Sequence, residues 1–377
     1  MTIAGSAKTL SILHVIAPAA FGGMESVVAT LARGHARRGH SVRVVSVLSP
    51  GDQSHPFVSA LAHNDVVSVS LHVGNRDYRA ERRAVRAICR DHRPDIVHTH
   101  GFRPDVVDGG VARGERIPVV STCHGFIEFG FRGVLYQWLQ RRTLKRYDAV
   151  IAVSVDIQTK LLRAGVPSDK IHLVVNAFEP TGPSMSRDAA RQILDLPNGP
   201  VIGWVGRLSA EKGADIALAA FALLRHPDTR LVMLGEGREL SSLRDRATAL
   251  GIADRVLWRG AIPNVGRLFP AFDAFLLSSR TEGTPMVLLE AMAARVPIVA
   301  TRVGGVPDVV DSGAAWLVES LEPNDIARAL DELLGRPDLA GARAHHASKR
   351  LHDRFAINPW LSRYESIYRD LASRSRR

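Results

Sequence analysis

The chain has 377 residues, of which 46% are hydrophobic and 23% charged, a composition that excludes a disordered chain and suggests at least two globular domains. Its net charge is +11, most of it in the first 180 residues. Two cysteines, Cys89 and Cys123, do not form a disulfide framework or a zinc site. No segment reaches the roughly 18 apolar residues of a membrane span. We therefore expect a cytoplasmic protein.

Short β-branched runs alternate with helical stretches along the chain, which is typical of buried parallel strands. In the first half these runs are 10–17, 41–48, 95–100, 118–124, 149–154 and 171–176. In the second half they are 200–207, 230–236, 255–260, 274–279, 297–304 and 315–318. Because a single open sheet rarely accepts so many strands, the pattern predicts an α/β protein with two doubly wound, Rossmann-like domains facing each other across a cleft.

A segment rich in Pro, Gly and Ser, residues 179–186, separates the two series of strands. We expect an N-terminal domain at 1–180 and a C-terminal domain at 181–355. A final helix at 356–377 is expected to pack back on the N-terminal domain.

Unusual residues collect where the predicted strands end, which is where ligands bind in such sheets. They are Gly22, Gly23, His100, Gly101, His124, Gly125 and Asn176 in the first half, and Arg207, Gly235, Glu282, Gly304 and Gly305 in the second. If both domains direct these ends toward one cleft, these residues surround a single ligand.

The segment TEGTPMVLLEAMAARVPIVATRVGG, residues 281–305, holds Glu282 and Glu290. Thr284 is a good N-cap and Pro285 a good first residue, so we expect a helix from 285 to 295. Helix starts attract phosphates, and a carboxylate suits the vicinal hydroxyls of ribose or a sugar. A nucleotide sugar has that layout. An equal alternative is that Glu290 is a buried acid satisfied by backbone N–H groups.

The segment VGRLSAEKG, residues 205–213, places Arg207 and Lys212 on either side of a turn, with a helix expected from about Ala210. Two cations there can neutralise a diphosphate. A solvated basic turn is the commoner alternative. The sequence lacks the dinucleotide and P-loop fingerprints, an Asp-x-Asp motif and any cluster with metal-ligand spacing. We expect no bound metal and no tightly bound cofactor.

These two segments, together with GEG, DIVHTHG, STCHGF and FGGMESVVATLARGHARRGHSVRVVS, resemble the retaining GT-B glycosyltransferases of family 4 over nearly the whole chain. The resemblance implies that the N-terminal domain binds an acceptor and the C-terminal domain a nucleotide sugar. The residues that it implies for catalysis are Glu282, His124, Arg207 and Lys212. The residues that it implies for donor binding are Arg207, Lys212, Glu290, Glu282, Gly22, Gly23, Gly235, Thr284, Met286 and Val287.

The implied reaction transfers a hexosyl group from a UDP-sugar, or secondly a GDP-sugar, with retained anomeric configuration and without a metal. The acceptor would be a glycan, a lipid-linked molecule or a small molecule, as in bacterial polysaccharide biosynthesis. Residues 126–147 join aromatic to basic side chains, which fits peripheral contact with an anionic membrane at the inner face of the plasma membrane. An ordinary helix with a basic end is the alternative.

Three other functions fit parts of the sequence. A nucleotide-sugar 2-epimerase or a phosphorylase-like enzyme could use a similar fold, although a phosphorylase needs a pyridoxal-phosphate lysine and no lysine lies in a convincing motif for one. The pI near 10.3 suggests a nucleic-acid-binding protein. Aromatic residues are not interleaved with the arginines as in a base-stacking platform, so we expect no nucleic acid partner.

Overall fold

The computed structural model describes residues 8–20, 22–61, 66–74, 76–125, 131–180 and 182–375, without the side chains of 131–134 and 136. The chain forms two compact units. The first comprises Met1–Val175 and Asn358–Arg377, and the second comprises Asn176–Ile357. The chain therefore enters the second unit after 175 and returns to the first at 358. The sequence expectation had placed these crossings after 180 and after 355.

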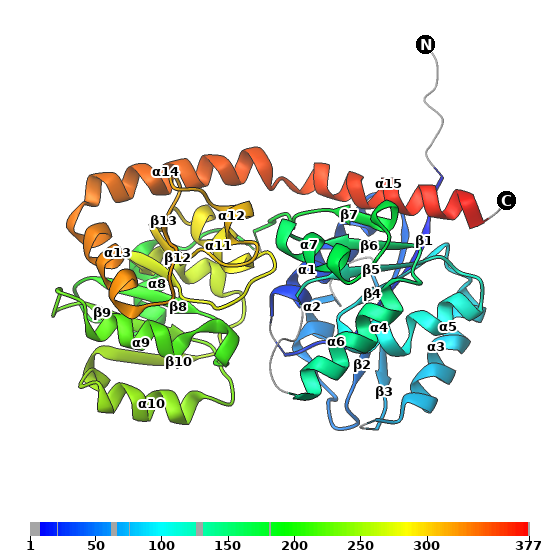
Figure 1. The fold of residues 1–377 in the computed structure, drawn as a ribbon, viewed down its shortest axis with the longest axis horizontal. Coiled ribbons are helices and arrows are strands. Elements are labelled where there is room, and N and C mark those ends of the chain that lie inside the picture. The colour runs from blue at the N-terminus through cyan, green and yellow to red at the C-terminus, as the bar shows by residue number, and fades with distance from the viewer. Residues whose placement is uncertain are drawn as a thin grey trace, which may run out of the picture. The chain divides into compact units, whose positions relative to one another are not determined.

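The first unit contains a seven-stranded parallel sheet in the order β3-β2-β1-β4-β5-β6-β7 (Figure 1). Its strands are β1 (Ser11–Ile16), β2 (Ser41–Leu48), β3 (Val67–His72), β4 (Ile96–His100), β5 (Val119–Cys123), β6 (Ala149–Ala152) and β7 (Ile171–Leu173). Its helices are α1 (Gly23–Arg37), α2 (Pro56–Leu61), α3 (Tyr78–His92), α4 (Phe102–Val107), α5 (Gly109–Gly114), α6 (Phe131–Leu144), α7 (Val155–Arg163), the 3-10 turn η1 (Ser168–Lys170) and α15 (Ile357–Ser375).

Strand β3 is the one strand of this sheet that the sequence analysis missed. Its sequence VSVSLH alternates apolar and polar residues, and it pairs only with β2 at the edge of the sheet. Ser70 and His72, on its polar face, are exposed. The analysis relied on continuous apolar runs, which mark strands buried on both faces, and an edge strand exposed on one face does not produce such a run.

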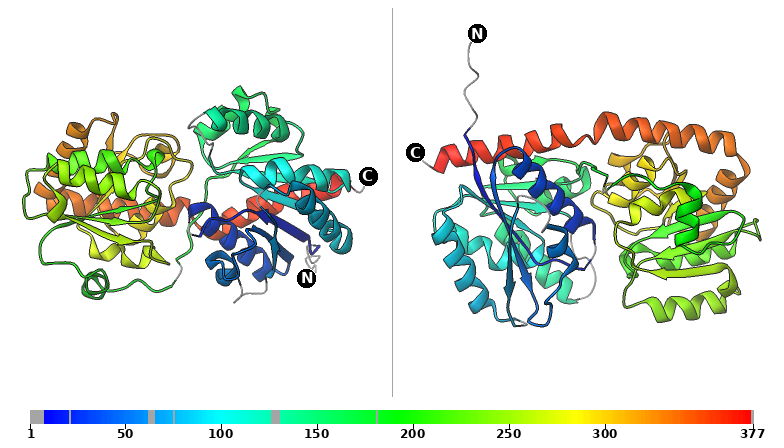
Figure 2. Two further views of the ribbon diagram at one scale, coloured as in Figure 1. Left: turned by 90° about the horizontal axis from the view of Figure 1, so that it is seen from below. Right: turned by 180° about the vertical axis from the view of Figure 1, so that it is seen from behind.

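Helices cover both faces of this sheet because alternate residues of each strand point to opposite sides. Leu13 and Val15 pack in a cluster with residues of α3, α5 and α6, whereas Ile16 packs with residues of α1 and α2. Helix α15, red in Figures 1 and 2, lies against this unit. Arg38 at the end of α1 donates to the carbonyl oxygen of Asn358 (2.8 Å) and to Glu365 (3.0 Å).

The second unit contains a six-stranded parallel sheet in the order β10-β9-β8-β11-β12-β13. Its strands are β8 (Val201–Val205), β9 (Arg230–Leu234), β10 (Val256–Gly260), β11 (Ala274–Leu277), β12 (Ile298–Thr301) and β13 (Trp316–Val318). Its helices are α8 (Arg187–Ile193), α9 (Ala214–Ala222), α10 (Leu240–Ala249), α11 (Met286–Ala293), α12 (Val306–Val309), α13 (Pro323–Gly335) and α14 (Pro337–Arg354). Its 3-10 turns are η2 (Ala210–Lys212), η3 (Ala253–Arg255) and η4 (Val265–Ala271).

All twelve strands expected from the sequence are present, and both sheets are wholly parallel, so the doubly wound α/β prediction is confirmed. In the second unit, Trp204, Phe221 and Leu330 belong to one buried cluster that joins the sheet to α9 and α13. Of the helices in the described part of the chain, none combines the length and the apolar character needed to cross a bilayer.

Candidate functional site

Both sheets reverse the direction in which strands are added, between β1 and β4 in the first unit and between β8 and β11 in the second. Ligands of doubly wound folds bind at the carboxyl ends of the strands beside such a reversal. The loops after β8 and β11 carry Arg207, Lys212 and Glu282. In the first unit, His100 ends β4 and His124 follows β5.

The turn after β8 carries the two cations expected there. Arg207 is exposed, and Lys212 closes η2. The sequence predicted a helix from about Ala210, but this stretch is a single 3-10 turn and α9 begins only after it. Gly213 is the physical reason, because its φ of +64° interrupts the helix. A Cβ at Gly213 would also lie 2.0 Å from the carbonyl oxygen of Ser278, so the turn packs closely on the loop after β11.

Lys212 and Glu282 form an ion pair with each other. The Lys212 Nζ lies 2.8 Å from Glu282 Oε1 and 2.9 Å from Oε2, and Ser279 Oγ donates to Oε1 at 2.6 Å. The Glu282 side chain is 5% exposed and that of Lys212 is 26% exposed. An ammonium group has three N–H donors, and Glu282 takes two of them. The pair thus fixes the acid and leaves one donor of Lys212 for a ligand.

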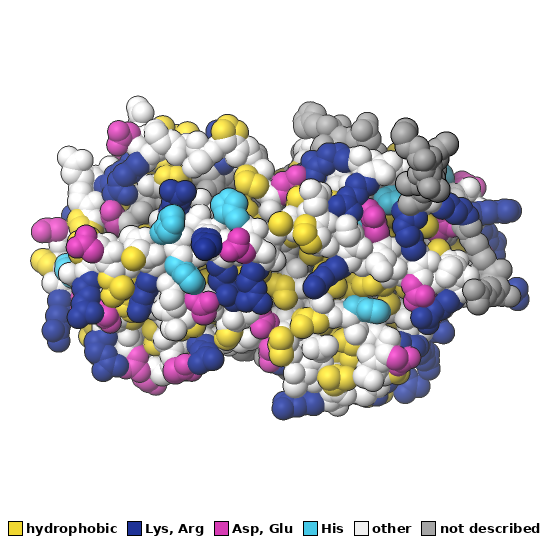
Figure 3. Space-filling view, turned by 90° about the horizontal axis from the view of Figure 1, so that it is seen from above, with side chains coloured by type: hydrophobic (Ala, Val, Ile, Leu, Met, Phe, Trp, Pro, Cys, Tyr) yellow, Lys and Arg dark blue, Asp and Glu magenta, His cyan; other side chains and the backbone are white. Residues whose placement is uncertain are grey.

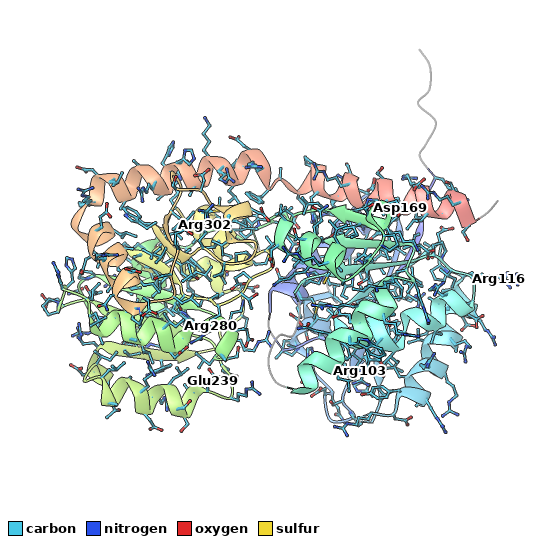
Figure 4. The ribbon with its side chains drawn as sticks, in the orientation of Figure 1. Arg103, Arg116, Asp169, Glu239, Arg280 and Arg302 are labelled. Carbon is cyan, nitrogen blue, oxygen red and sulfur yellow. The ribbon has the colours of Figure 1, made fainter. Side chains whose placement is uncertain are left out.

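Arg280, labelled in Figure 4, ties η2 to the loop after β11. Its guanidinium donates to both carboxylate oxygens of Asp215 (2.8 and 2.7 Å) and to the carbonyl oxygen of Ala210 (2.6 Å). Its backbone N–H donates to the carbonyl oxygen of Glu211 at 2.9 Å. These bonds connect the elements that carry Lys212 and Glu282. Sequence analysis did not find Arg280, since nothing in its local motif links it to Asp215.

Helix α11 begins one residue later and ends two residues earlier than the sequence predicted. Pro285, rather than Thr284, occupies the N-cap position, with extended backbone at ψ 101°. The prediction that Thr284 caps the helix is therefore wrong, because the extended conformation of Pro285 delays the first helical residue. Met286 and Val287 form the first turn, and both are partly exposed. Their backbone N–H groups lie at the start of the helix, where an anion would bind.

Glu290 lies in the middle of α11 with its carboxylate against η4. A Cβ added to Gly266 would come within 3.2 Å of Glu290 Oε1, so the absence of a side chain there provides the space for the acid. Glu290 Oε2 is buried and has no hydrogen-bond partner among the described residues. Burial raises the pKa of Glu290 to about 7. The backbone N–H groups that the alternative interpretation required do not reach Oε2. The sequence analysis missed Gly266.

Gly235 follows β9, where the sequence analysis placed a donor contact. A Cβ there would lie 1.8 Å from the carbonyl oxygen of Gly206, and the φ of Gly235 is +145°. Gly206 N–H donates to the carbonyl oxygen of Leu234 at 3.0 Å, which holds the two loops together. Packing between these loops explains the glycine, and its contact with a ligand stays a prediction.

In the first unit, α1 follows the loop after β1 and begins at Gly23 with Gly22 as its N-cap. Glu25, in the first turn of this helix, is buried, and its Oε1 accepts a hydrogen bond from the Ala19 N–H at 2.8 Å. The carboxylate thus ties the loop after β1 to the helix start. The glycines lie where the sequence placed them, and their contact with a ligand stays a prediction.

Three histidines form a hydrogen-bonded chain on the face of the sheet covered by α1 and α15. His124 Nε2 lies 3.4 Å from His100 Nδ1, and His100 Nε2 lies 3.0 Å from His14 Nδ1. His100 and His14 are fully buried, whereas His124 is only partly buried. Burial lowers the pKa of His124 to about 4 and that of His14 to about 3. Burial first, and then the neighbouring histidines, hold the pKa of His100 well below its usual range. All three rings are neutral near pH 7.

His98 lies beside this chain and connects the sheet to α15. Its Nδ1 lies 2.6 Å from Tyr368 Oη and its Nε2 lies 2.8 Å from Thr122 Oγ1. Its ring is 4.0 Å from that of His100, centroid to centroid. The ring nitrogens of His14, His98 and His100 lie within 4.8 Å of one another, a spacing that could hold a metal ion. Both nitrogens of His98 are already engaged in the bonds above, so hydrogen bonding accounts for the cluster.

The sequence matches known proteins in both units. Residues 21–181 match the family described as Glycosyltransferase Family 4, and residues 186–350 match Glycosyl transferases group 1. N-acetyl-alpha-D-glucosaminyl L-malate synthase of Bacillus anthracis is 30% identical over 287 residues, which are 74% of this chain and 75% of that protein. The chain belongs to glycosyltransferase family 4. This confirms the family that the motifs around Arg207, Glu282 and Glu290 indicated.

This glycosyltransferase also resembles proteins that are named for other donors and acceptors. A GDP-mannose-dependent alpha-(1-6)-phosphatidylinositol monomannoside mannosyltransferase of Mycolicibacterium smegmatis is 32% identical over 240 residues, 60% of this chain and 59% of that protein. The structure of Anabaena HepE in complex with UDP-glucose has a TM-score of 0.84 at 22% identity, covering 97% of this chain and all of the other. The glycosyltransferase therefore has the GT-B fold.

Proposed function

We propose that this glycosyltransferase moves a hexosyl group from a UDP-sugar, or secondly a GDP-sugar, to a glycan or lipid-linked acceptor, with retained configuration and no metal. The second unit binds the donor and the first unit the acceptor. The observation that carries the proposal is the buried Oε2 of Glu290, which has no hydrogen-bond partner among the described residues and lies on the same helix whose start presents N–H groups. An unsatisfied buried acid costs stability, and a ligand that donates to it recovers that cost.

A nucleoside diphosphate sugar carries hydrogen-bond donors for Glu290 and negative charge for Lys212 and Arg207. Two vicinal ribose hydroxyls can donate to Glu290, and the diphosphate can accept from Lys212 and Arg207. Glu282, held by Lys212 and Ser279, has the position and charge to accept from hydroxyls of the donor sugar. UDP-glucose bound to HepE and the GDP-mannose dependence of the mycobacterial relative support the two nucleotides.

In the proposed reaction, the bond between the anomeric carbon and the diphosphate breaks. Positive charge builds at the sugar ring and negative charge on the diphosphate. Lys212 and Arg207 offset the negative charge. Glu282 is held by Lys212 and Ser279, which disfavours its use as a covalent nucleophile. The leaving phosphate therefore accepts the proton of the acceptor hydroxyl on the face where the new bond forms, which retains the configuration.

Nucleotide binding tests this function first. In a thermal-shift screen of UDP, GDP, ADP, CDP and TDP, we expect UDP to raise the melting temperature most, because a ligand at about 100 times its Kd adds about 2.7 kcal/mol to the free energy of unfolding. The winning sugar conjugate is then incubated with acceptors and EDTA, and the product's anomeric configuration is read by NMR. No shift with any nucleotide, or a product of inverted configuration, would contradict the proposal.

The basic composition left a nucleic-acid-binding role open. On the face shown in Figure 3, lysine and arginine side chains are scattered over both units and interspersed with acidic and apolar ones. Nucleic-acid-binding proteins instead gather their cations in one patch or stripe. The distribution on that face gives the binding of nucleic acid no support.

We further propose that the acceptor is lipid-linked and that α6 contacts an anionic membrane. Leu135 and Trp138 are 51% and 55% exposed, and Arg142, one turn further along the same side, lies over the Trp138 ring at 5.6 Å. Lys145 and Arg146 are exposed just beyond the end of the helix. Phe126 and Phe129 lie outside the described residues, as does the side chain of Phe131. An exposed aromatic group beside cations fits a lipid interface.

Vesicle binding tests the membrane contact. We expect the protein to sediment with anionic vesicles at low salt but not with neutral ones. Replacing Trp138 with serine and Arg142 with glutamine should lower the partition coefficient by on the order of tenfold, since each basic residue contributes about 1 kcal/mol near such a surface. Ile193→Ser, an exposed apolar residue of the second unit, is the control. Equal sedimentation of all variants would show that α6 does not contact the membrane.

A further inference from the structure

His14, the buried end of the histidine chain, determines which ring donates in each of its hydrogen bonds. His14 Nε2 is buried and has no hydrogen-bond partner among the described residues. A neutral imidazole carries one N–H donor and one lone-pair acceptor. Buried N–H groups without a partner are rarer than acceptors without one. The proton of His14 therefore belongs on Nδ1, the nitrogen 3.0 Å from His100 Nε2.

This assignment propagates along the chain to His124. Because His14 Nδ1–H donates, His100 Nε2 accepts, and the proton of His100 is on Nδ1. His100 Nδ1–H then donates to His124 Nε2 at 3.4 Å, so the proton of His124 is on Nδ1. The opposite direction would leave the proton of His14 on the buried nitrogen without a partner.

His98 does not compete with this direction. His98 packs beside His100, but its nitrogens bond to Tyr368 and Thr122 rather than to the chain. Its bonds also join α15 to the sheet. Full burial of His14 and His100 keeps both rings neutral. Each ring of the histidine chain then carries one proton, as the assignment requires.

We propose that His14 and His100 are positioning residues that hold His124 as its Nδ1–H tautomer, so that His124 offers a hydrogen-bond donor to a carbohydrate oxygen at the carboxyl end of β5. The inference rests on the proposed glycosyl transfer for its consequence. A ring with Nε2 occupied and Nδ1 protonated cannot accept the proton of the acceptor hydroxyl. His124 then binds a sugar oxygen and is not the base of the reaction.

The tautomer can be read directly on the substrate-free, full-length chain. Imidazole 15N chemical shifts of the histidine-labelled protein distinguish protonated from unprotonated ring nitrogens, and His124→Gln assigns the signals. We expect Nδ1 of His124 to be protonated and Nε2 unprotonated at pH 7.5. A protonated Nε2, or rapid exchange between both forms, would overturn the inference whether or not the protein transfers a sugar.

Variants of His14 test whether the chain sets the tautomer. His14→Met removes the donor to His100, so we expect His124 to populate both tautomers and kcat/KM to fall about tenfold while the affinity for the donor nucleotide is retained. His14→Gln keeps an N–H donor and should restore both readouts. His172→Gln, which removes a histidine of β7 outside the chain, is the control. An unchanged His124 tautomer in His14→Met would overturn the positioning role.

Discussion

Replacing Glu290 with glutamine should make the substrate-free protein more stable and its nucleotide binding weaker. Burial raises the pKa of this carboxyl to about 7 from its ordinary value of 4.5. The folded state thus binds the proton more tightly than the unfolded state, and the free energy of unfolding falls as the pH rises from 4.5 to 7. Above pH 7 the full cost is present, up to about 3 kcal/mol. Glutamine carries no charge and avoids that cost.

Unfolding in urea separates this effect from other consequences of the substitution. The gain in the free energy of unfolding for Glu290→Gln should be small at pH 5 and approach its maximum at pH 8. Glu319→Gln, which changes an exposed acid paired with Arg302, should stay within about 0.5 kcal/mol of the parent protein at both values. A loss of stability for Glu290→Gln at pH 8 would mean that the carboxylate has a structural partner.

The same substitution should raise the Kd for UDP by about tenfold to a hundredfold, because hydrogen bonds to a charged group contribute about 1.5–3 kcal/mol. Calorimetry provides a second signal. When ribose hydroxyls donate to the carboxylate, its pKa falls and nucleotide binding near pH 6.5 releases a proton, which is seen as a dependence of the heat on the buffer. An unchanged Kd for Glu290→Gln would show that this acid does not bind the nucleotide.

Replacing Lys212 with methionine should reduce kcat by about a hundredfold to a thousandfold. The diphosphate gains negative charge as the sugar leaves, and a lost electrostatic partner of the transition state has effects of about this size. Glu282 would also lose two of its three hydrogen bonds and keep only the one from Ser279. We expect the free energy of unfolding to fall by about 3 kcal/mol. This is the low end of the cost of breaking a buried ion pair, because Lys212 is partly exposed.

A double variant separates chemistry from stability. In Lys212→Met with Glu282→Gln, no buried charge is left unpaired, so the free energy of unfolding should recover while kcat stays low. Lys212→Arg, measured in parallel, keeps the charge and should retain more activity than Lys212→Met. If Lys212→Met remains within tenfold of the parent in kcat, the lysine serves only to hold Glu282.

The fold could be predicted from the sequence wherever burial decided the residue type. Strands buried on both faces produced continuous apolar runs, and these runs indicated two doubly wound sheets. Strand β3, exposed on one face, did not. The start of a helix was harder to predict, because the positive φ of Gly213 delays the start of α9 and the extended backbone at Pro285 delays that of α11. Local backbone conformation, unlike burial, leaves little trace in composition.

The candidate site was predicted as residue types rather than as contacts. The motifs identified Lys212 and Glu282 but assigned them to different parts of a ligand, and their ion pair follows only from the adjacency of β8 and β11. The sequence analysis gave His14 no role. Its contact with His100 depends on the pairing of β1 with β4, which joins segments 86 positions apart in sequence. Strand order is the information that local patterns lack.

Helix α15 has a consequence for the synthesis of this chain. Its Tyr368 covers the His98 face of the first sheet, yet it is translated after the whole second unit. While the ribosome completes the intervening residues, the part of that face that α15 covers remains in contact with water. A premature stop codon before α15 would leave Arg207, Lys212, Glu282, His100 and His124 in the chain, and it would still leave the first unit permanently incomplete.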